Sequence, residues 1–195
     1  PLDGGAIYVR NSRVSIKSPK DAVNLGIAYL SEDRKRFGLV TGLSVSENVT
    51  MSSWQRFAKG KFWMRDKQMR QSSLGFVDLL KIKTPSVDQE TRLLSGGNQQ
   101  KVLIGRWLMT QPRILMLDEP TRGIDVGAKA EIYQLLDELA GEGKALLVIS
   151  SELPELIGLC RRILVMREGR LAGEVARQNF SEHGLLEIMA GVAAA

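Results

Sequence analysis

The stretch ILMLDEP, residues 114–120, decides how the rest of the sequence is interpreted. Its first four residues form an apolar run that is typical of a parallel strand buried on both faces. The run ends in Asp118 and Glu119, which predicts two adjacent carboxylates at the carboxyl edge of an open α/β sheet, where such sheets bind ligands. A strand that ends in Asp-Glu is more often a solvated strand end, so the pair needs support from elsewhere in the chain.

A second stretch, LLSGGNQQK at residues 93–101, precedes the strong apolar run VLIGRWLM. The order predicts that Ser95 caps a helix and that Gly96 and Gly97 form its first turn. The N–H groups of a helix N-terminus favour negative charge, and glycines allow an anion to approach closely. A plain helix cap is the alternative interpretation of the same residues.

The composition is that of an ordinary globular chain. It has 195 residues, of which 44% are hydrophobic and 25% charged, enough for one domain or one domain with an inserted subdomain. The single cysteine, Cys160, excludes an internal disulfide and fits a reducing compartment. The net charge of +5 is compatible with nucleic acid, an anionic membrane surface or an acidic partner, and equally with an evenly solvated surface.

Strand-like and helical patterns alternate outside the middle of the chain. The apolar runs predict strands at residues 6–9, 13–16, 26–30, 114–118, 145–150, 163–166 and 170–175, with the first pair and the last pair forming hairpins. Helices are predicted at residues 18–26, 130–140 and 182–191. In the second of these, Ile132, Leu135, Leu136 and Leu139 form one apolar stripe.

The middle of the chain, residues 44–107, predicts helices and no strands. Ser44 stands three residues before Glu47, the spacing of a capping box. Phe76, Leu79 and Leu80 are predicted to share one helical face. We therefore expect a small helical insertion in an α/β domain.

Taken together, the motifs and their order resemble the nucleotide-binding domain of ABC transporters. LSGGN at residues 94–98 matches the family's signature motif, ILMLDE matches Walker B, and TRGID matches the D-loop. Four stretches, YLSEDRKRFGLV, LLSGGNQQK, DEPTRGIDVGAK and ISSELPE, are similar to the second ATPase half of tandem proteins that drive import of ribose and related monosaccharides. The resemblance runs from Gly4 to about Val175.

The resemblance implies a P-loop-NTPase-like α/β fold with a parallel-sheet core, an inserted α-helical signature subdomain and an N-terminal β-hairpin. Residues 1–43 and 108–195 would form the α/β core, and residues 44–107 the helical subdomain. It also implies ATP and Mg²⁺ as cofactors. The expected partners are a second ABC ATPase domain, transmembrane permease subunits and, indirectly, a periplasmic or extracellular sugar-binding protein, with the chain peripheral on the cytoplasmic face of a bacterial plasma membrane.

Roles for individual residues follow from the same resemblance. Asp118 would hold Mg²⁺ indirectly, and Glu119 would act on the attacking water. The signature residues would bind the γ-phosphate of an ATP held mainly by the partner domain, and the D-loop would end at Asp125; the signature set is Ser95, Gly96, Gly97, Asn98 and Gln99.

Three features depart from the family pattern. No stretch matches the P-loop pattern G-x-x-x-x-G-K-[ST], so we expect the chain to begin after that segment and to hydrolyse ATP negligibly by itself. Glu32 occupies the position of the Q-loop glutamine, and Ser151 that of the switch histidine. A carboxylate lacks the amide's donor, and a hydroxyl cannot act as a cationic clamp on a phosphate. The site built on this domain is therefore expected to turn over less than its partner's.

Two other classes of function stay open at this point. A soluble ABC ATPase acting on nucleic acid would suit the basic charge and would bind DNA in a salt-dependent way, although the compact insertion lacks the long coiled coil or zinc insertion of repair proteins. A non-catalytic regulatory half is the third interpretation. The charged run at residues 32–36 is expected to be mostly solvated, His183 to be solvated or structural, and Cys160 to be core.

Overall fold

The computed structural model describes residues 4–59 and 63–192 of the chain. It divides the chain into two compact units, Pro1–Leu147 and Val148–Ala195. Each unit is described by itself. The predicted assignment of residues 44–107 to a helical subdomain is a different division, and it stays a prediction.

The sheet of the first unit contains the strands β3 (Ile27–Leu30), β6 (Ile114–Asp118) and β7 (Ala145–Ile149), in the order β3-β6-β7. The strands β3 and β6 are parallel, and Ile27 pairs with Ile114. Because parallel neighbours end at the same edge, the loops that follow β3 and β6 emerge side by side. The expected strands and parallel core are confirmed.

The expectation that the strand at residues 114–118 is buried on both faces is wrong, and the strand at residues 145–150 is also only partly covered. In β6, the buried Leu115 and Leu117 alternate with residues that are only partly buried, and in β7 Leu147 and Ile149 are about half exposed. A strand is buried on both faces only where elements cover both. Leu115 and Leu117 lie on the face that also meets Ile104 of the long helix α5 (Gly96–Leu108), so the covered face is the one that packs on this helix.

The N-terminal residues fold as the local sequence predicts. The strands β1 (Ile7–Val9) and β2 (Ser12–Val14) form an antiparallel hairpin, and the φ angles of the two turn residues, Arg10 and Asn11, are 53° and 61°. Two positive φ angles define the turn whose twist suits a two-residue hairpin. The helix α1 (Pro19–Asn24) begins at a capping box between Ser18 and Asp21, so the short helix predicted here is confirmed.

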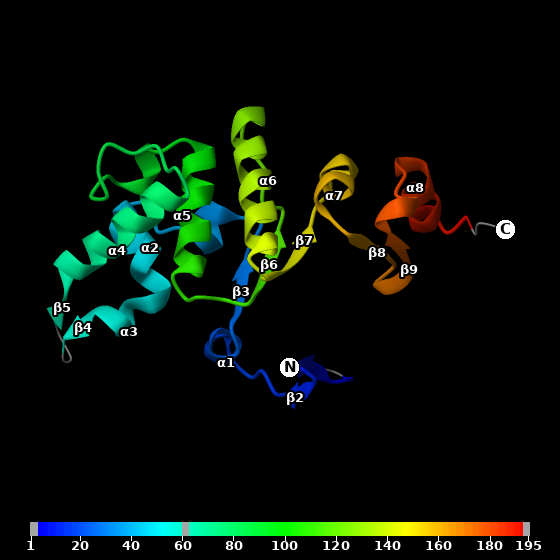
Figure 1. Ribbon diagram of the computed structural model, residues 1–195, viewed down its shortest axis with the longest axis horizontal. Coiled ribbons are helices and arrows are strands. Elements are labelled where there is room, and N and C mark those ends of the chain that lie inside the picture. The colour runs from blue at the N-terminus through cyan, green and yellow to red at the C-terminus, as the bar shows by residue number, and fades with distance from the viewer. Residues whose placement is uncertain (1–3, 60–62, 193–195) are drawn as a thin grey trace. The chain divides into compact units, whose positions relative to one another are not determined.

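Residues between β3 and β6 form a run of short helices. Figure 1 shows α2, α3, α4 and α5 gathered on one side of β3 and β6. The elements are η1 (Arg34–Gly38, a π-helix), α2 (Val45–Thr50), η2 (Met51–Ser53), α3 (Trp54–Phe57), β4 (Ala58–Lys59), β5 (Trp63–Met64), α4 (Asp66–Leu79), η3 (Thr91–Leu93) and α5.

Two expectations for this region were wrong and one is confirmed. The region is not free of strands, because β4 and β5 pair antiparallel where the chain reverses between α3 and α4; this pairing satisfies backbone groups in an exposed turn. Leu79 is 61% exposed, since the buried face of α4 runs through Met69, Ser73 and Leu80. The capping box of Ser44 and Glu47 is present at the start of α2.

A buried arginine, which the sequence did not signal, holds this region together. The guanidinium of Arg106 in α5 donates to the backbone oxygen and the side-chain oxygen of Asn48 in α2, and to the backbone oxygen of Gly38 at the end of η1. Burial lowers the pKa of Arg106 to about 10. The cation is therefore solvated by protein oxygens in place of water.

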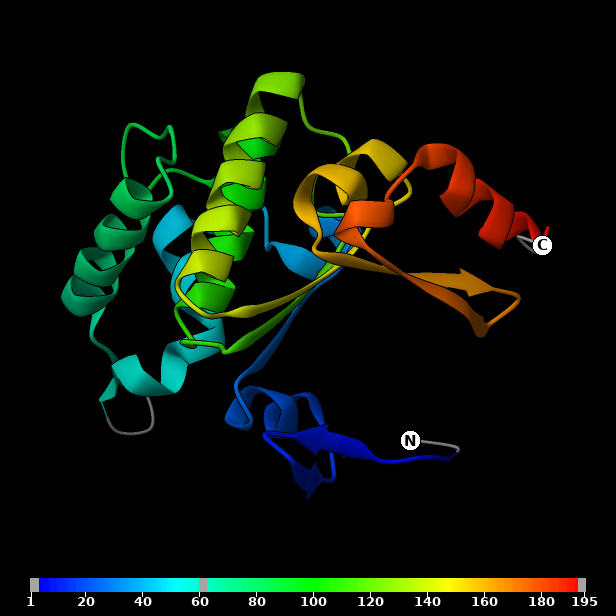
Figure 2. The ribbon, with the colours of Figure 1, turned by 45° about the vertical axis from the view of Figure 1, so that its right-hand side comes forward.

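The helix α6 (Val126–Gly141) lies beside α5 in Figures 1 and 2. Its predicted apolar stripe is confirmed, since Ile132, Leu135, Leu136 and Leu139 are all buried. The two helices are also joined by a buried amine, because Lys101 Nζ lies 2.6 Å from Glu131 Oε2.

The second unit is built on a hairpin and two helices. The elements are α7 (Leu153–Leu159), β8 (Arg162–Arg167), β9 (Arg170–Ala176), η4 (Arg177–Asn179) and α8 (Glu182–Ala190). The hairpin turns at Glu168 and Gly169, both with positive φ, as predicted. Cys160 is half-buried against the core of this unit, and burial raises the pKa of its thiol. The side chain of His183 is 86% exposed, which confirms that it is solvated.

Candidate functional site

The two carboxylates that follow β6 lie beside the end of β3. The hydroxyl of Tyr29 in β3 donates to Asp118 Oδ2 at 2.8 Å. This hydrogen bond, together with desolvation and the negative charge of Asp118, raises the pKa of Tyr29. Tyr29 therefore stays a hydrogen-bond donor and orients the Asp118 carboxylate. The sequence analysis missed Tyr29, which alternates with the buried Ala28 and Leu30 and so lies on the exposed face of β3.

Glu119 has an unusual backbone conformation. Its φ angle is 49°, in the left-handed region that residues other than glycine rarely adopt, and its backbone oxygen accepts from the N–H of Arg122 at 3.2 Å. Such strain is often found at functional sites, where the surrounding structure maintains it. The conformation turns the chain sharply as it leaves β6, so that Glu119 starts the acidic loop, residues 119–125.

The glycine turn, residues 95–97, opens α5 as predicted. Ser95 is the N-cap, and its Oγ accepts from the N–H of Asn98 at 3.5 Å and from the Asn98 carboxamide at 2.9 Å. Asn98 in turn accepts from the backbone N–H of Lys83 at 2.8 Å. The N–H groups of Gly96 and Gly97 are the first two of the helix and have no acceptor within it. These two groups are the natural donors for an anion.

Both glycines also face the acidic loop and α6. A Cβ added at Gly97 would lie 2.4 Å from the Cβ of Ala128 in α6. A Cβ added at Gly96 would lie 2.8 Å from the guanidinium of Arg34 and 3.2 Å from the backbone oxygen of Gly123. Packing inside the chain therefore favours glycine at position 97 independently of any ligand, whereas a side chain at position 96 would displace the Arg34 guanidinium.

Gln99, the fifth residue of the expected signature set, is bonded inside the chain. The side chain of Gln99 is buried, with its amide donating to the backbone oxygen of Thr91 at 3.0 Å. Its backbone N–H donates to the backbone oxygen of Ser95 at 2.9 Å. The backbone N–H and the side-chain amide of Gln99 thus both bond inside the chain, and the side chain is buried. Direct contact of this residue with a ligand is not supported by the geometry.

The end of the acidic loop starts α6. Asp125 is the N-cap, and its Oδ1 accepts from the backbone N–H of Ala128 at 2.9 Å. The side chain lies at the surface, so the residue combines a capping function with an exposed position on the loop.

The segment after β3 is tied to the acidic loop through Glu32 and Arg34. Apart from the partly buried Arg34, the described side chains of the charged run at residues 32–36 are exposed, as expected. Glu32 forms an ion pair with Arg122 at 3.1 Å. The guanidinium of Arg34 donates to the backbone oxygens of Arg122 at 2.9 Å and Gly123 at 3.2 Å, and to Gln99 Oε1 at 3.4 Å. Arg34 is partly buried, and desolvation lowers its pKa. The position expected for a Q-loop glutamine thus carries a carboxylate already paired within the chain.

Ser151 belongs to the second unit and is exposed in the loop before α7. In the same loop, Ser150 Oγ bonds to Glu155 and accepts from the backbone N–H of Glu152 at 3.0 Å. The neighbouring serine and glutamate therefore fix the backbone on either side of Ser151.

The first unit therefore packs the helix N–H donors and the Arg34 guanidinium against residues 122–124 of the acidic loop. The carboxylates stand at the other end of that loop, where Asp118 accepts from Tyr29. No group of three or more His, Cys, Asp or Glu residues able to hold a metal ion occurs within residues 4–59 and 63–192. A magnesium ion commonly binds through one or two carboxylates plus phosphate oxygens and water, so Asp118 is suited to be one ligand among several. Within the part of the chain that the structure describes, no helix has the length and apolarity to cross a membrane.

Comparison with known proteins identifies relatives at both the sequence and the fold level. A family model described as "ABC transporter" matches residues 1–122. The chain is 52% identical over 188 residues to a "Putative ribose/galactose/methyl galactoside import ATP-binding protein 3" of Burkholderia ambifaria, covering 96% of this chain and 37% of that protein. It is 46% identical over 189 residues to a "Ribose import ATP-binding protein RbsA" of Clostridium perfringens, covering 96% of this chain and 38% of the relative. The chain thus spans well under half the length of these relatives.

The fold is found in solved structures of low sequence identity. The structure titled as MJ1267, an ATP-binding cassette of an ABC transporter, superposes with a TM-score of 0.79 at 24% identity, covering 95% of this chain and 77% of that one. The ADP conformation of the same cassette gives a TM-score of 0.78 at 24% identity, covering 97% of this chain and 78% of that one.

Proposed function

The chain belongs to the ABC transporter family, and on that basis we propose that it is the ATP-binding, energy-coupling part of an importer for ribose or a related monosaccharide. The observation that carries this proposal is the packing of the glycine turn against the acidic loop that follows Asp118 and Glu119. The names of the relatives support the substrate class, since they are described as ribose or ribose/galactose/methyl galactoside import ATP-binding proteins.

In this proposal the glycine turn binds the γ-phosphate of ATP. The N–H groups of Gly96 and Gly97 stand at the positive end of the α5 dipole, where an anion is favoured. Ser95 is exposed and would add a hydroxyl donor at the same place. That phosphate would belong to an ATP held mainly by a second ABC ATPase domain, in the same polypeptide or in a dimer mate.

Asp118 and Glu119 would serve an ATP held on this domain itself. Asp118 would hold Mg²⁺ through water, with the Tyr29 hydroxyl fixing the orientation of its carboxylate. The ion would neutralise charge on the phosphates. Glu119 would orient and polarise the attacking water, a task suited to a carboxylate held at a fixed backbone angle.

The site on this domain is proposed to turn over more slowly than the site on its partner. Glu32 stands where an amide donor is usual and is paired with Arg122, so it cannot donate to a phosphate or a water. Ser151 stands where an imidazole is usual, and a hydroxyl carries no positive charge. The N–H donors of Gly96 and Gly97 support the proposal that the firmer contribution of this chain is to its partner's site.

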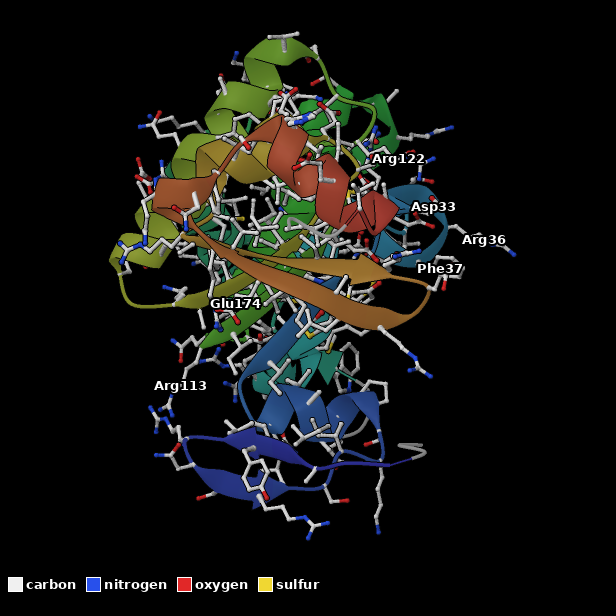
Figure 3. The ribbon with its side chains drawn as sticks, turned by 90° about the vertical axis from the view of Figure 1, so that its right-hand side faces the viewer. Asp33, Arg36, Phe37, Arg113, Arg122 and Glu174 are labelled. Carbon is white, nitrogen blue, oxygen red and sulfur yellow. The ribbon has the colours of Figure 1, made fainter. Side chains whose placement is uncertain are left out.

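The surface after β3 is proposed to contact the membrane permease. Phe37 is 70% exposed and Val40 is 45% exposed, whereas Leu39 is buried. Figure 3 shows Arg36 and Phe37 projecting away from the ribbon of η1. Cysteine introduced at Val40 should therefore cross-link to a membrane subunit, and the chain would lie on the cytoplasmic face of the plasma membrane as a peripheral component.

Two substitutions at Ser95 test the phosphate contact without removing the helix cap. Aspartate and asparagine are both good N-caps of the same size, so Ser95→Asp and Ser95→Asn differ in charge and little else. In the whole gene product assembled with its permease, S95D is expected to lower ATP hydrolysis by a factor on the order of 10² or more, because the added carboxylate repels the phosphate. S95N is expected to stay within about tenfold of the unmodified protein.

Equal ATPase rates for the two variants would show that no phosphate approaches the glycine turn. Uptake of labelled ribose and galactose in the same preparation tests the substrate class separately. Suppose that S95D abolishes ATP hydrolysis but the assembled system transports neither sugar. The ATPase proposal would then stand, and the proposed substrate class, ribose or a related monosaccharide, would be refuted.

A further inference from the structure

Arg34 contacts two parts of the chain that are distant from it in the sequence. Its guanidinium bonds to two consecutive carbonyl oxygens of the acidic loop, those of Arg122 and Gly123, and to the Gln99 side chain of α5. These contacts join segments 65 to 89 residues apart in the sequence. We propose that Arg34 is a positioning residue that holds the glycine turn against the acidic loop and so fixes the direction of the Gly96 and Gly97 N–H groups. This inference rests on the function proposed above.

The geometry requires an arginine. The two terminal nitrogens, Nη1 and Nη2, reach different carbonyl oxygens at 2.9 and 3.2 Å, while Nε reaches Gln99 Oε1 at 3.4 Å. A planar fork with fixed donor directions can bridge three acceptors at once, whereas a lysine ammonium on a flexible stem cannot hold that arrangement. The side chain therefore acts as a rigid spacer between the loop and the helix.

The contact extends past Gln99 into the helical region. The Gln99 amide donates to the backbone oxygen of Thr91, four residues before Ser95 of the glycine turn. A movement of the turn would therefore have to break the bond from Arg34 to Gln99 or carry the acidic loop with it. Arg34 is linked in this way to both ends of the segment that contains the turn.

The guanidinium also lies directly against the turn. A Cβ on Gly96 would come within 2.8 Å of Arg34 Nη2, so the space beside the glycine is occupied by the guanidinium. A cation next to the positive end of a helix dipole is unfavourable by itself. The two backbone carbonyl oxygens offset that repulsion, and an arriving phosphate would reverse it.

The test compares Arg34→Gln with Arg34→Lys and with the control Arg36→Gln in the whole gene product. Arg36 lies in the same π-helix, and its guanidinium sits over the Phe37 ring, 5.2 Å from the centroid, so R36Q removes the same charge without touching the turn. Backbone hydrogen exchange is measured over residues 95–99 and 121–125, and over β3 and β6 as references. ATP hydrolysis is measured as kcat and KM.

R34Q is expected to speed exchange at both test segments by about tenfold or more, the factor for a lost charge-assisted hydrogen bond, and to leave β3 and β6 unchanged. Displacement of the donors by a fraction of an ångström should lower kcat by a factor on the order of 10², with KM for ATP changed by less than about threefold. R34K, which keeps the charge but loses the fork, should behave like R34Q. R36Q should leave exchange at residues 95–99 and 121–125 as in the unmodified protein.

The outcomes separate this inference from the proposed function. Unchanged exchange at residues 95–99 in R34Q overturns the inference, even if the protein hydrolyses ATP. Equal acceleration in β3 and β6 also overturns it, because Arg34 would then act on general stability. If R34K behaves like the unmodified protein, the argument that the planar guanidinium is required is refuted. R34K also serves as the test variant if R34Q does not fold. Absence of ATPase activity in the unmodified protein would refute the proposed function and leave the exchange comparison valid.

Discussion

Replacing Gly97 by alanine is expected to destabilise the first unit, because the added methyl group would meet α6. The new Cβ would lie 2.4 Å from the Cβ of Ala128, whereas carbon atoms in contact prefer roughly 3.5–4.0 Å. The helices would have to separate by about 1 Å, and overpacking of this kind costs about 1–3 kcal/mol. Alanine is favoured over glycine in a helix by roughly 0.5–1 kcal/mol, which leaves a net loss between about zero and about 2.5 kcal/mol.

A second substitution makes this reasoning specific. Ala128→Gly removes the methyl group that the new side chain meets, and by itself should cost about 1 kcal/mol through lower helix propensity. In the A128G background the effect of Gly97→Ala should change sign, from destabilising to neutral or slightly stabilising. Urea unfolding followed by tryptophan fluorescence measures this, because Trp54, Trp63 and Trp107 all lie in the first unit. A double-mutant cycle over the four proteins gives the coupling free energy.

Gly75 in α4 provides the matched control. A Cβ added at Gly75 meets no atom within 4 Å, so Gly75→Ala should stabilise the chain by up to about 1 kcal/mol. If G97A stabilises the protein as much as G75A does, α5 and α6 can separate freely and the packing argument is wrong. An unchanged effect of G97A in the A128G background would equally refute the assigned contact.

Three further changes give predictions with separate measurements. Tyr29→Phe should raise the Mg²⁺ concentration for half-maximal ATPase activity by about tenfold, because the phenol no longer orients Asp118; an unchanged magnesium titration would contradict this. Glu131→Gln should destabilise the chain by about 1–3 kcal/mol at neutral pH, because buried Lys101 loses its anionic partner. Lys101 lowers the pKa of Glu131, so this contribution is complete above the ordinary carboxyl pKa and is lost as pH falls through the depressed value; urea midpoints of E131Q and the unmodified protein should therefore converge in acid. Ser151→Ala should leave ATP turnover within about threefold of the unmodified rate. A far larger fall would indicate that the site on this domain carries most of the turnover, contrary to the proposal.

The helix starts could be predicted because their determinants are local. Ser18, Ser44, Ser95 and Ser181 each cap a helix through a backbone N–H two or three positions into it. A residue and its capping partner are therefore visible within four positions of sequence. The strand pair β4–β5 was missed because two-residue strands show no periodicity, and their pairing depends on the chain reversal between α3 and α4.

The carboxylate pair of the candidate site could also be predicted, since a buried apolar run that ends in acids places them at a sheet edge. The contacts around the pair could not. Tyr29 and Asp118 are 89 residues apart, and Arg34 and Arg122 are 88 residues apart. Only the pairing of β3 with β6 brings these residues together, and charge by itself suggested that residues 32–36 were solvated.

The glycines of the turn show most clearly what one sequence leaves open. Glycine is needed where a ligand approaches the backbone closely, and it is also needed where a neighbouring helix packs closely. Either cause therefore explains Gly96 and Gly97 equally well. The structure supplies the second cause directly, through Ala128 and Arg34. Loss of activity in a glycine variant would therefore not establish a phosphate contact, because the same change displaces α6 or the guanidinium. Ser95 escapes this ambiguity, since its side chain is exposed and its capping function survives in aspartate and asparagine. A charge effect that appears only in S95D would thus report a ligand, whereas a reversal of the G97A effect by A128G reports packing.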